Sequence, residues 1–321
     1  MKSFVIDKND ANKRLDKFIA KAVPGLPSSL MYKYIRTKRI KICGRRAEIS
    51  TRLSVGDVVD MYINDEFFKP TVPKYDFLSA SPKIDIVYED ENILLVNKKQ
   101  GLLVHPDKNE YGDTLISRIQ HYLYNKGEYD PDREHSFRPA LANRIDRNTC
   151  GIVIAAKTAE ALQTLCEKIK EHEIEKWYLA IIHGCPNKKS DTLTAYLEKD
   201  ADKNRVFLKA TPSPNSKMIK TAYQVLAVKN NLSLVKIRLL TGRTHQIRAQ
   251  FSFLGHPLLG DGKYGNIQKD KKQGFKHQAL CSYKLKFNFT TPAGCLEYLN
   301  QKAFQIRHIW FIDELFDDIN Y

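Results

Sequence analysis

The stretch LLTGRTHQIRAQFSFLGHPLLGDGKYG, residues 239–265, joins an apolar run to an amphipathic segment through a short polar turn. Apolar residues recur in it at helical spacing, which predicts a helix that begins near Thr244 and is ended by Gly255. Such a helix can dock one apolar face on a protein core. The residues of that face are Ile247, Phe251 and Leu254.

Basic side chains gather at the start of this predicted helix. Arg243 precedes the first turn, and His245 and Arg248 follow within the first turns. Backbone N–H groups at a helix N-terminus and arginine side chains both bind anions, so the pattern predicts a site for a phosphate or a carboxylate. A surface helix with incidental arginines is the alternative interpretation.

A second polar loop lies in ANRIDRNTCGIVIAAKT, residues 142–158. Asp146 stands between Arg144 and Arg147, directly before the apolar run 152–156, which predicts a buried strand. A carboxylate between two arginines beside a buried strand indicates a functional site, and a loop salt bridge is the alternative. A third loop of this polar kind is NKKQGLLVHP, residues 97–106.

The remaining pattern after residue 83 mixes strands and helices. Residues 84–99 predict two strands joined by a turn, and a helix is expected from Thr158 onward. The runs 177–184 and 223–240 predict further strands, the second of them a hairpin. Residues 84–321 are therefore predicted to form an α+β domain with a mixed, largely antiparallel sheet and flanking helices.

The N-terminal segment concentrates positive charge. Residues 1–63 contain 14 Lys+Arg and 6 Asp+Glu, a net +8 of the +15 carried by all 321 residues. Such clustering indicates a polyanionic partner, whereas a basic surface that only aids solubility is the alternative. Apolar spacing predicts a helix around Leu15–Ala22, a second helix capped by Ser28 or Ser29, and short strands near 40–42 and 58–62.

Composition narrows the class of protein further. The segment 64–83 contains three prolines without clear periodicity and is interpreted as a linker. No apolar run approaches the roughly 18 residues of a membrane helix, and the first residues contain no apolar signal segment. The six cysteines form no CxxC pair, so we expect buried thiols in a reducing cytosol and no metal site.

Together these stretches resemble the RluA-type family of RNA pseudouridine synthases. The run TGRTHQIR with its trailing GHPLLGDGKYG, the run NRIDRNTCG and the run KWYLAIIHG correspond to three of the family's motifs. Residues 13–63 resemble the S4-like RNA-binding domain, through RLDKF, a basic helix, RIKICGRR and VGDVV. A preceding S4-like module is usual in the branch that acts on large-subunit ribosomal RNA.

The resemblance implies a division into an S4-like α/β RNA-binding domain at 1–63, the linker 64–83 and a pseudouridine synthase catalytic domain at 84–321. It also implies an isomerase that flips a uridine out of the RNA and needs no cofactor. RNA, most often ribosomal RNA, is the implied partner, and we expect a cytoplasmic monomer without a membrane or metal partner. A catalytically inactive RNA-binding or ribosome-assembly protein is the alternative function.

The resemblance also implies roles for individual residues. Asp146 would be the catalytic nucleophile or base, Tyr178 would stack on the target base, and Arg248 would be the buried partner of Asp146. Arg144 would enter the RNA stack when the uridine leaves, and Arg243 and His245 would meet the RNA backbone. The S4-like module would contact RNA through Lys33, Arg36, Lys38, Arg39, Arg45 and Arg46. An aromatic residue in a strand is most often core, so a purely structural role for Tyr178 is the alternative.

Several positions depart from the family pattern. They leave the aspartate, tyrosine and arginine in place but change residues that would surround them, which bears on the geometry of the site and on substrate choice. The departures are Lys99 in place of proline, Asn143 in place of histidine, Cys150 in place of serine or threonine, and Gln250 and Cys281 in place of histidines.

Overall fold

The structure is a computed structural model that describes residues 1–69, 75–107, 110–200, 205–319 and 321. The described residues form two compact units. The first comprises Met1–Lys83, His105–Ala140 and Ala156–Gln163, and the second comprises Ile84–Val104, Leu141–Ala155 and Thr164–Tyr321. None of the helices within these ranges is long and apolar enough to cross a bilayer.

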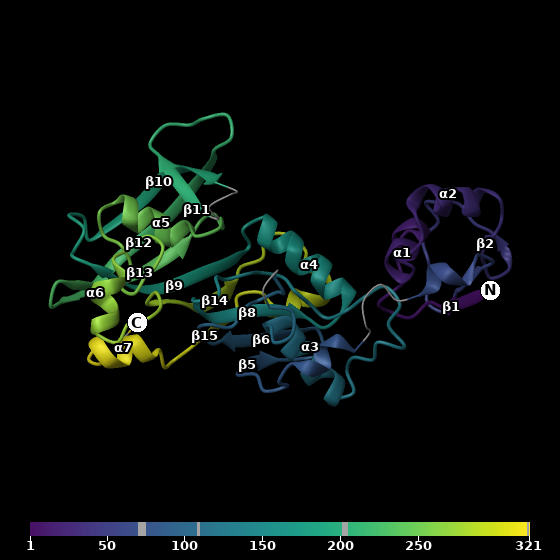
Figure 1. Cartoon of the computed structure of the whole chain (residues 1–321), viewed down its shortest axis with the longest axis horizontal. Coiled ribbons are helices and arrows are strands. Elements are labelled where there is room, and N and C mark those ends of the chain that lie inside the picture. Colours follow the sequence, from purple (N-terminus) through teal and green to yellow (C-terminus); the bar gives the residue numbers. More distant parts are fainter. Residues whose placement is uncertain (70–74, 108–109, 201–204, 320) are drawn as a thin grey trace. The chain divides into compact units, whose positions relative to one another are not determined.

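The N-terminal part of the first unit packs two helices against a small antiparallel sheet of order β1-β4-β2-β3 (Figure 1). The first helix follows the predicted periodicity, but the predicted serine cap of the second is wrong. Pro27 occupies the N-cap without a side-chain hydrogen bond, and Ser28 already belongs to the first turn. The elements are β1 (Lys2–Val5), α1 (Leu15–Ala22), α2 (Ser28–Arg36), β2 (Ile40–Ile42), β3 (Arg45–Arg46) and β4 (Val58–Met61).

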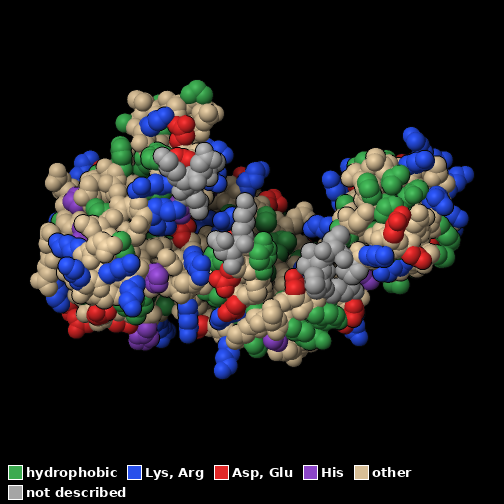
Figure 2. Space-filling view, in the orientation of Figure 1, with side chains coloured by type: hydrophobic (Ala, Val, Ile, Leu, Met, Phe, Trp, Pro, Cys, Tyr) green, Lys and Arg blue, Asp and Glu red, His purple; other side chains and the backbone are tan. Residues whose placement is uncertain are grey.

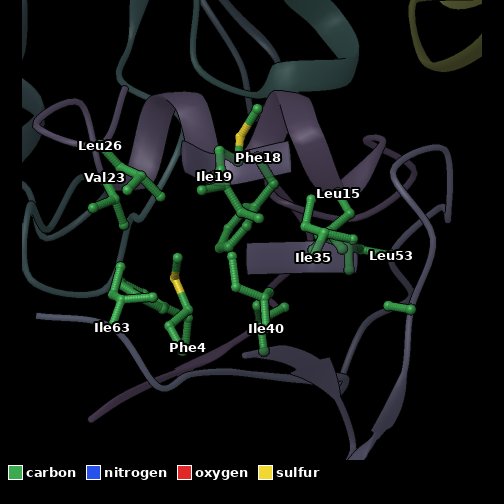
Figure 3. Close-up of a cluster of buried hydrophobic side chains, with 14 of the residues drawn as sticks. Phe4, Leu15, Phe18, Ile19, Val23, Leu26, Ile35, Ile40, Leu53 and Ile63 are labelled. Carbon is green, nitrogen blue, oxygen red and sulfur yellow. The ribbon is translucent and has the colours of Figure 1, made fainter. Parts of the chain in front are cut away.

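A continuous apolar core holds these elements together. Side chains from α1, β1 and β2, among them Phe18, Phe4 and Ile40, point toward one another in Figure 3. The turn between β2 and β3 uses Cys43 and Gly44 with φ of 47° and 73°, the paired positive values of a tight hairpin. The core thereby fixes the chain direction on both sides of the basic hairpin.

The predicted linker contains local structure on both sides of residues 70–74, which lie outside the described residues. Short 3-10 helices occur at Asp65–Phe68 and Asp76–Ser79. Phe77 is buried, with its ring centroid 5.6 Å from that of Tyr129. The helix α3 (Leu115–Asn125) of the same unit contacts the second 3-10 helix.

The second unit is built on a large mixed sheet, as the α+β prediction requires. Its described strands follow the order β11-β10-β12-β13-β9-β14-β8-β6-β5 (Figure 1). Neighbouring pairs from β11 to β14 are antiparallel, and β8 pairs in parallel with β14. The strands are β5 (Ile86–Glu89), β6 (Ile93–Lys98), β7 (Ala140–Leu141), β8 (Cys150–Ala156), β9 (Ile174–His183), β10 (Ser190–Asp200), β11 (Arg205–Lys209), β12 (Lys217–Lys229), β13 (Leu232–Leu239), β14 (Leu280–Phe287) and β15 (Ala303–Gln305).

One helix brings the motif TGRTHQIR, residues 241–248, onto this sheet. The helix α5 (Gln246–Phe253) packs against β10 and β11, and its Ile247 and Phe251 join the core beneath β9, β12 and β13. It begins two residues later than predicted, because His245 adopts a left-handed conformation at the N-cap. The other helical segments are α4 (Ala159–Lys170), α6 (Ile267–Lys272), η3 (Gly294–Leu299) and α7 (Trp310–Leu315).

Candidate active site

Arg248 bridges two carboxylates in the second unit. Its Nη1 donates to Asp146 Oδ2 at 2.8 Å, while Nε and Nη2 donate to the two oxygens of Asp261 at 2.8 and 2.9 Å. The Arg248 and Asp261 side chains are buried, whereas 24% of the Asp146 side chain remains exposed. The arrangement anchors the arginine on the inner carboxylate and presents the outer one to solvent.

Electrostatic interactions favour the charged forms of the two buried partners, Arg248 and Asp261. Burial lowers the pKa of Arg248, but the two carboxylates outweigh it and hold that pKa above its ordinary value. Burial raises the pKa of Asp261, but the hydrogen bonds and positive charge of Arg248, together with the backbone N–H groups of Lys263 and Tyr264, outweigh burial and hold that pKa below its ordinary value. A bidentate arginine–carboxylate pair of this kind is geometrically well defined. The guanidinium also lies 5.4 Å from the ring centroid of Tyr264.

A buried lysine that was not predicted as a site residue from the sequence holds the loop that carries Asp146. Lys98 is buried and donates to the backbone oxygens of Lys99, Leu102 and Arg147 at 2.8–2.9 Å. Burial lowers the pKa of its ammonium to about 8. Lys98 therefore ties residues 99–102 to the residue that follows Asp146.

Tyr178 lies on β9 in the core beneath α5. It pairs in register with Ile237 on β13, and Ile145, the neighbour of Asp146, packs against the same cluster. Burial raises the pKa of the Tyr178 hydroxyl to about 12, and Asp146 adds to the shift, so the hydroxyl keeps its proton at neutral pH. The structure thus brings Tyr178, Arg248 and Asp146 into one region.

His245 lies at the edge of the same cluster. Its Nε2 is 3.9 Å from Asp146 Oδ2, and its Nδ1 is 3.0 Å from the Tyr264 hydroxyl. Burial lowers the pKa of the imidazole to about 4, although Asp146 acts in the opposite direction. The ring is therefore neutral at physiological pH.

A buried glutamine shapes the turn that precedes α5. Gln246 Oε1 accepts from the Arg243 backbone N–H and the Thr241 hydroxyl, both at 3.0 Å. Its Nε2 donates to Lys220 O and Thr221 Oγ1 on β12. These bonds hold residues 241–245 as a turn, which explains the later helix start. They also place His245 and Arg248 toward Asp146.

The anions that the predicted site at this helix start holds through Arg248 are carboxylates of the chain itself. Arg248 is already engaged by two carboxylates, so it does not present a free cation to an external anion. Arg144 and Arg243 are exposed. The six cations predicted to contact RNA from the N-terminal module are exposed as well, and Figure 2 shows Lys and Arg side chains gathered around that module.

Four of the five departures from the family pattern have local structural roles, whereas the Lys99 side chain is exposed. Asn143 Oδ1 accepts from Ile154 N at 2.7 Å and so ties the Asp146 loop to β8. Gln250 bonds the Thr221 hydroxyl and the Leu193 carbonyl beneath α5. Cys150 and Cys281 are register partners on β8 and β14, so the two thiols occupy facing positions at the base of the loop.

Comparison with known proteins places this geometry in a family. A family model described as RNA pseudouridylate synthase matches residues 92–253. An uncharacterized RNA pseudouridine synthase of Mycoplasma pneumoniae is 36% identical over 289 residues, 88% of this chain and 87% of that protein. Ribosomal large subunit pseudouridine synthase C of Vibrio cholerae is 28% identical, over 90% of this chain and 89% of that protein.

A solved structure agrees at the level of the fold. Human RNA Pseudouridylate Synthase Domain Containing 4 aligns with a TM-score of 0.55 and 21% identity, covering 71% of this chain and 89% of that one. The chain therefore belongs to the RluA-type family of RNA pseudouridine synthases. It is an isomerase that converts uridine in RNA to pseudouridine, which confirms the predicted class of enzyme.

Proposed function

We propose that this enzyme modifies uridines of large-subunit ribosomal RNA in the cytoplasm, with Asp146 as the catalytic residue. The name of the Vibrio cholerae relative, which aligns over nine-tenths of the chain, supports the ribosomal substrate. One observation carries the catalytic assignment. A partly exposed carboxylate, Asp146, is held at 2.8 Å by an arginine that is itself fixed on the buried Asp261.

The proposed chemistry breaks the N1–C1′ bond of a uridine, turns the base and rejoins it through C5. No atom is gained and no redox change occurs, so the proposal includes no cofactor and no metal. Asp146 either attacks the substrate or removes the C2′ proton, and both roles use its ionised form. Arg248 keeps that charge fixed in orientation, while the protonated Tyr178 offers an aromatic face to the base.

The target base must leave the RNA stack first, at a cost of a few kcal/mol that is smaller in single-stranded or distorted RNA. In the proposal, Arg144 fills the vacated space, and Arg243 and His245 meet the RNA backbone. The 1–63 segment acts as an S4-like RNA-binding module through Lys33, Arg36, Lys38, Arg39, Arg45 and Arg46, and the enzyme acts as a monomer. The exposure of these cations supports their part in the proposal.

Mapping of pseudouridines in ribosomal RNA tests the substrate. Cells that lack this protein should lose specific pseudouridines in the large-subunit RNA, and expression of the wild-type chain should restore them. Expression of the Asp146→Asn variant should not, because the amide is neutral and cannot serve as nucleophile or base. Ribosomal RNA with an unchanged set of pseudouridines in the deletion strain would refute the ribosomal assignment. A restored set with Asp146→Asn would instead support the alternative of an RNA-binding protein.

A further inference from the structure

A cavity of about 320 Å³ lies in the second unit at the start of β9 and the end of β13. It is lined by residues from the end of α4, from both strands and from the turn that leads to His245. The same turn is the one that Gln246 fixes. The cavity is thus bordered by a backbone segment that continues directly into the active-site helix.

The wall of this cavity contains a mostly buried lysine, Lys176 on β9. Within the described part of the chain its ammonium makes no hydrogen bond and no ion pair, and burial lowers the pKa of this group. Lysine is rarely buried unless it is paired, because removing an ammonium from water without compensation is costly. An unpaired lysine that faces a cavity indicates an anionic ligand.

The other charged side chains around the cavity reinforce this inference. Glu175, the carboxylate in the lining, is already bound by Arg238 at 2.7 Å, and Arg238 also lies over the Trp177 ring at 5.5 Å. Lys176 and the exposed Arg243 then leave the lining with excess positive charge. A compact ammonium is well suited to a phosphate, which it binds as a point charge.

The position of Lys176 connects the cavity with the reaction. Lys176 and Tyr178 are two residues apart on β9, so their side chains leave the same face of the strand about 7 Å apart. A phosphate held by Lys176 would therefore lie within about one nucleotide of a base that stacks on Tyr178. Gly242 borders the space before this ammonium, since a Cβ at that position would lie 3.9 Å from Lys176 Nζ, an ordinary van der Waals contact.

We propose that this cavity, with Lys176 at its wall and Arg243 at its edge, is a subsite for one backbone phosphate of the substrate RNA beside the target uridine. The proposal rests on RNA being the substrate, and it assigns to Lys176 a binding role rather than a catalytic one. Each RNA phosphate that a protein cation neutralises releases counterions, so the subsite contributes to the salt dependence of RNA binding.

Salt titrations of the full-length protein with a single-stranded oligouridylate test the subsite. Lys176→Met should lower the slope of log affinity against log salt by about 0.7, the value for one phosphate in a single strand. Lys176→Arg should keep most of the slope. Lys236→Met is the matched control, because Lys236 is half-buried on the neighbouring strand β13 and does not line the cavity.

A second pair of variants tests the subsite without changing any charged residue. Gly242→Leu should fill the space before Lys176 and lower the slope as Lys176→Met does, whereas Gly242→Ala should bind as the wild type does. In the absence of RNA, the Lys176→Met variant should unfold at the same temperature as the wild type or at a higher one, because the substitution removes an uncompensated buried charge. A wild-type slope for folded Lys176→Met, or for Gly242→Leu, would overturn the subsite. The proposed ribosomal target is tested separately, by the mapping of pseudouridines.

Discussion

The cluster around Asp146 and the basic face of the N-terminal module both concentrate charge, but they hold it in opposite ways. In the cluster, Arg248 is 8% exposed and makes three hydrogen bonds to two carboxylates. On the basic face, Lys33 and Arg36 on α2 and Arg45 and Arg46 on the hairpin project into solvent. The first arrangement is preorganised for one geometry, whereas the second tolerates many.

This difference has energetic consequences. Breaking a buried pair leaves an uncompensated charge and typically costs about 3–5 kcal/mol, while an exposed pair is worth about 0–1 kcal/mol. A single residue should therefore matter greatly in the cluster and little on the basic face. The cluster suits chemistry on one atom, and the face suits sequence-tolerant affinity for an RNA backbone.

The largest effect is expected for Asp146→Asn. The substitution keeps the shape of the side chain and removes its negative charge, so turnover should fall by a factor of about 10⁴ or more, the scale seen when a catalytic carboxylate or its partner is lost. RNA affinity should stay near that of the wild type, since the RNA-facing cations are unchanged. Single-turnover kinetics and a binding titration on the same RNA measure both quantities. Turnover within tenfold of the wild type would exclude Asp146 as the catalytic residue.

A second large effect is expected for Arg248→Ala. Asp146 and Asp261 lose their shared partner, and the free energy of unfolding should fall by about 3–5 kcal/mol. The rate at saturating RNA should fall as well, because Asp146 is no longer held. Arg248→Lys should recover only part of both, since a point charge cannot reproduce the contacts of Nε, Nη1 and Nη2.

The exposed Arg243 supplies the matched control for this experiment. Arg243→Ala should weaken RNA binding and leave both the stability and the saturated rate close to the wild type. Urea unfolding and single-turnover rates for the three variants separate these outcomes. If Arg248→Ala reacts at the wild-type rate once RNA is saturating, Arg248 serves stability alone and its contact with Asp146 has no catalytic role.

A smaller, distributed effect is expected on the basic face. Neutralising Lys33, Arg36, Arg45 and Arg46 together to glutamine should reduce the log–log salt slope of RNA binding by up to about 3, at roughly 0.7 for each single-strand phosphate. The single-turnover rate at saturating RNA should not change. Each single substitution should give a correspondingly small step.

Neutralising single side chains tests the basic face with less disturbance of the structure than deleting residues 1–63, because that segment forms hydrogen bonds with other parts of its own unit. The buried Asp10 accepts from the Ser136 backbone N–H at 3.0 Å, and Lys13 donates to the Ser136 hydroxyl at 2.6 Å. A control variant should carry glutamine at Lys2, Lys8, Lys17 and Lys21, which are exposed elsewhere on the module. An equal loss of slope in both quadruple variants would mean that net charge, and not this face, sets RNA affinity.

The same contrast explains what could be predicted from the sequence. Local periodicity and turn chemistry gave the hairpin of β12 and β13, where Asn230 and Asn231 take positive φ values of 50° and 59°. The strand β1 escaped detection because it is short and buries only Phe4. The hairpin depends on neighbours within a few residues, whereas β1 is a strand through its pairing with β4, more than 50 residues further along the chain.

The polar framework of the site could not be predicted in this way. Asp261, Gln246 and Lys98 act through partners that lie 13, 26 and 49 residues away in the chain. Their motifs were visible, but a motif does not tell which carboxylate an arginine will reach. The resemblance to a family pointed to Arg248 beside Asp146, and only the three-dimensional arrangement adds the second carboxylate.

The smallest effect concerns His245 and acid pH. Its folded-state pKa of about 4 lies below the unfolded value of about 6.5, so the unfolded chain binds more protons between these pH values. His245 therefore contributes stability that is complete above pH 6.5 and is lost as the pH falls toward 4. Between pH 7 and pH 5 the wild type should lose about 1–2 kcal/mol of unfolding free energy more than His245→Gln does. The fully exposed side chain of His308 offers a control, and His308→Gln should follow the wild type. Urea unfolding at the two pH values measures the difference. Equal losses for the wild type and His245→Gln would show that the cluster around Asp146 does not lower the pKa of this imidazole. The fixed geometry of the cluster would then not extend beyond Arg248.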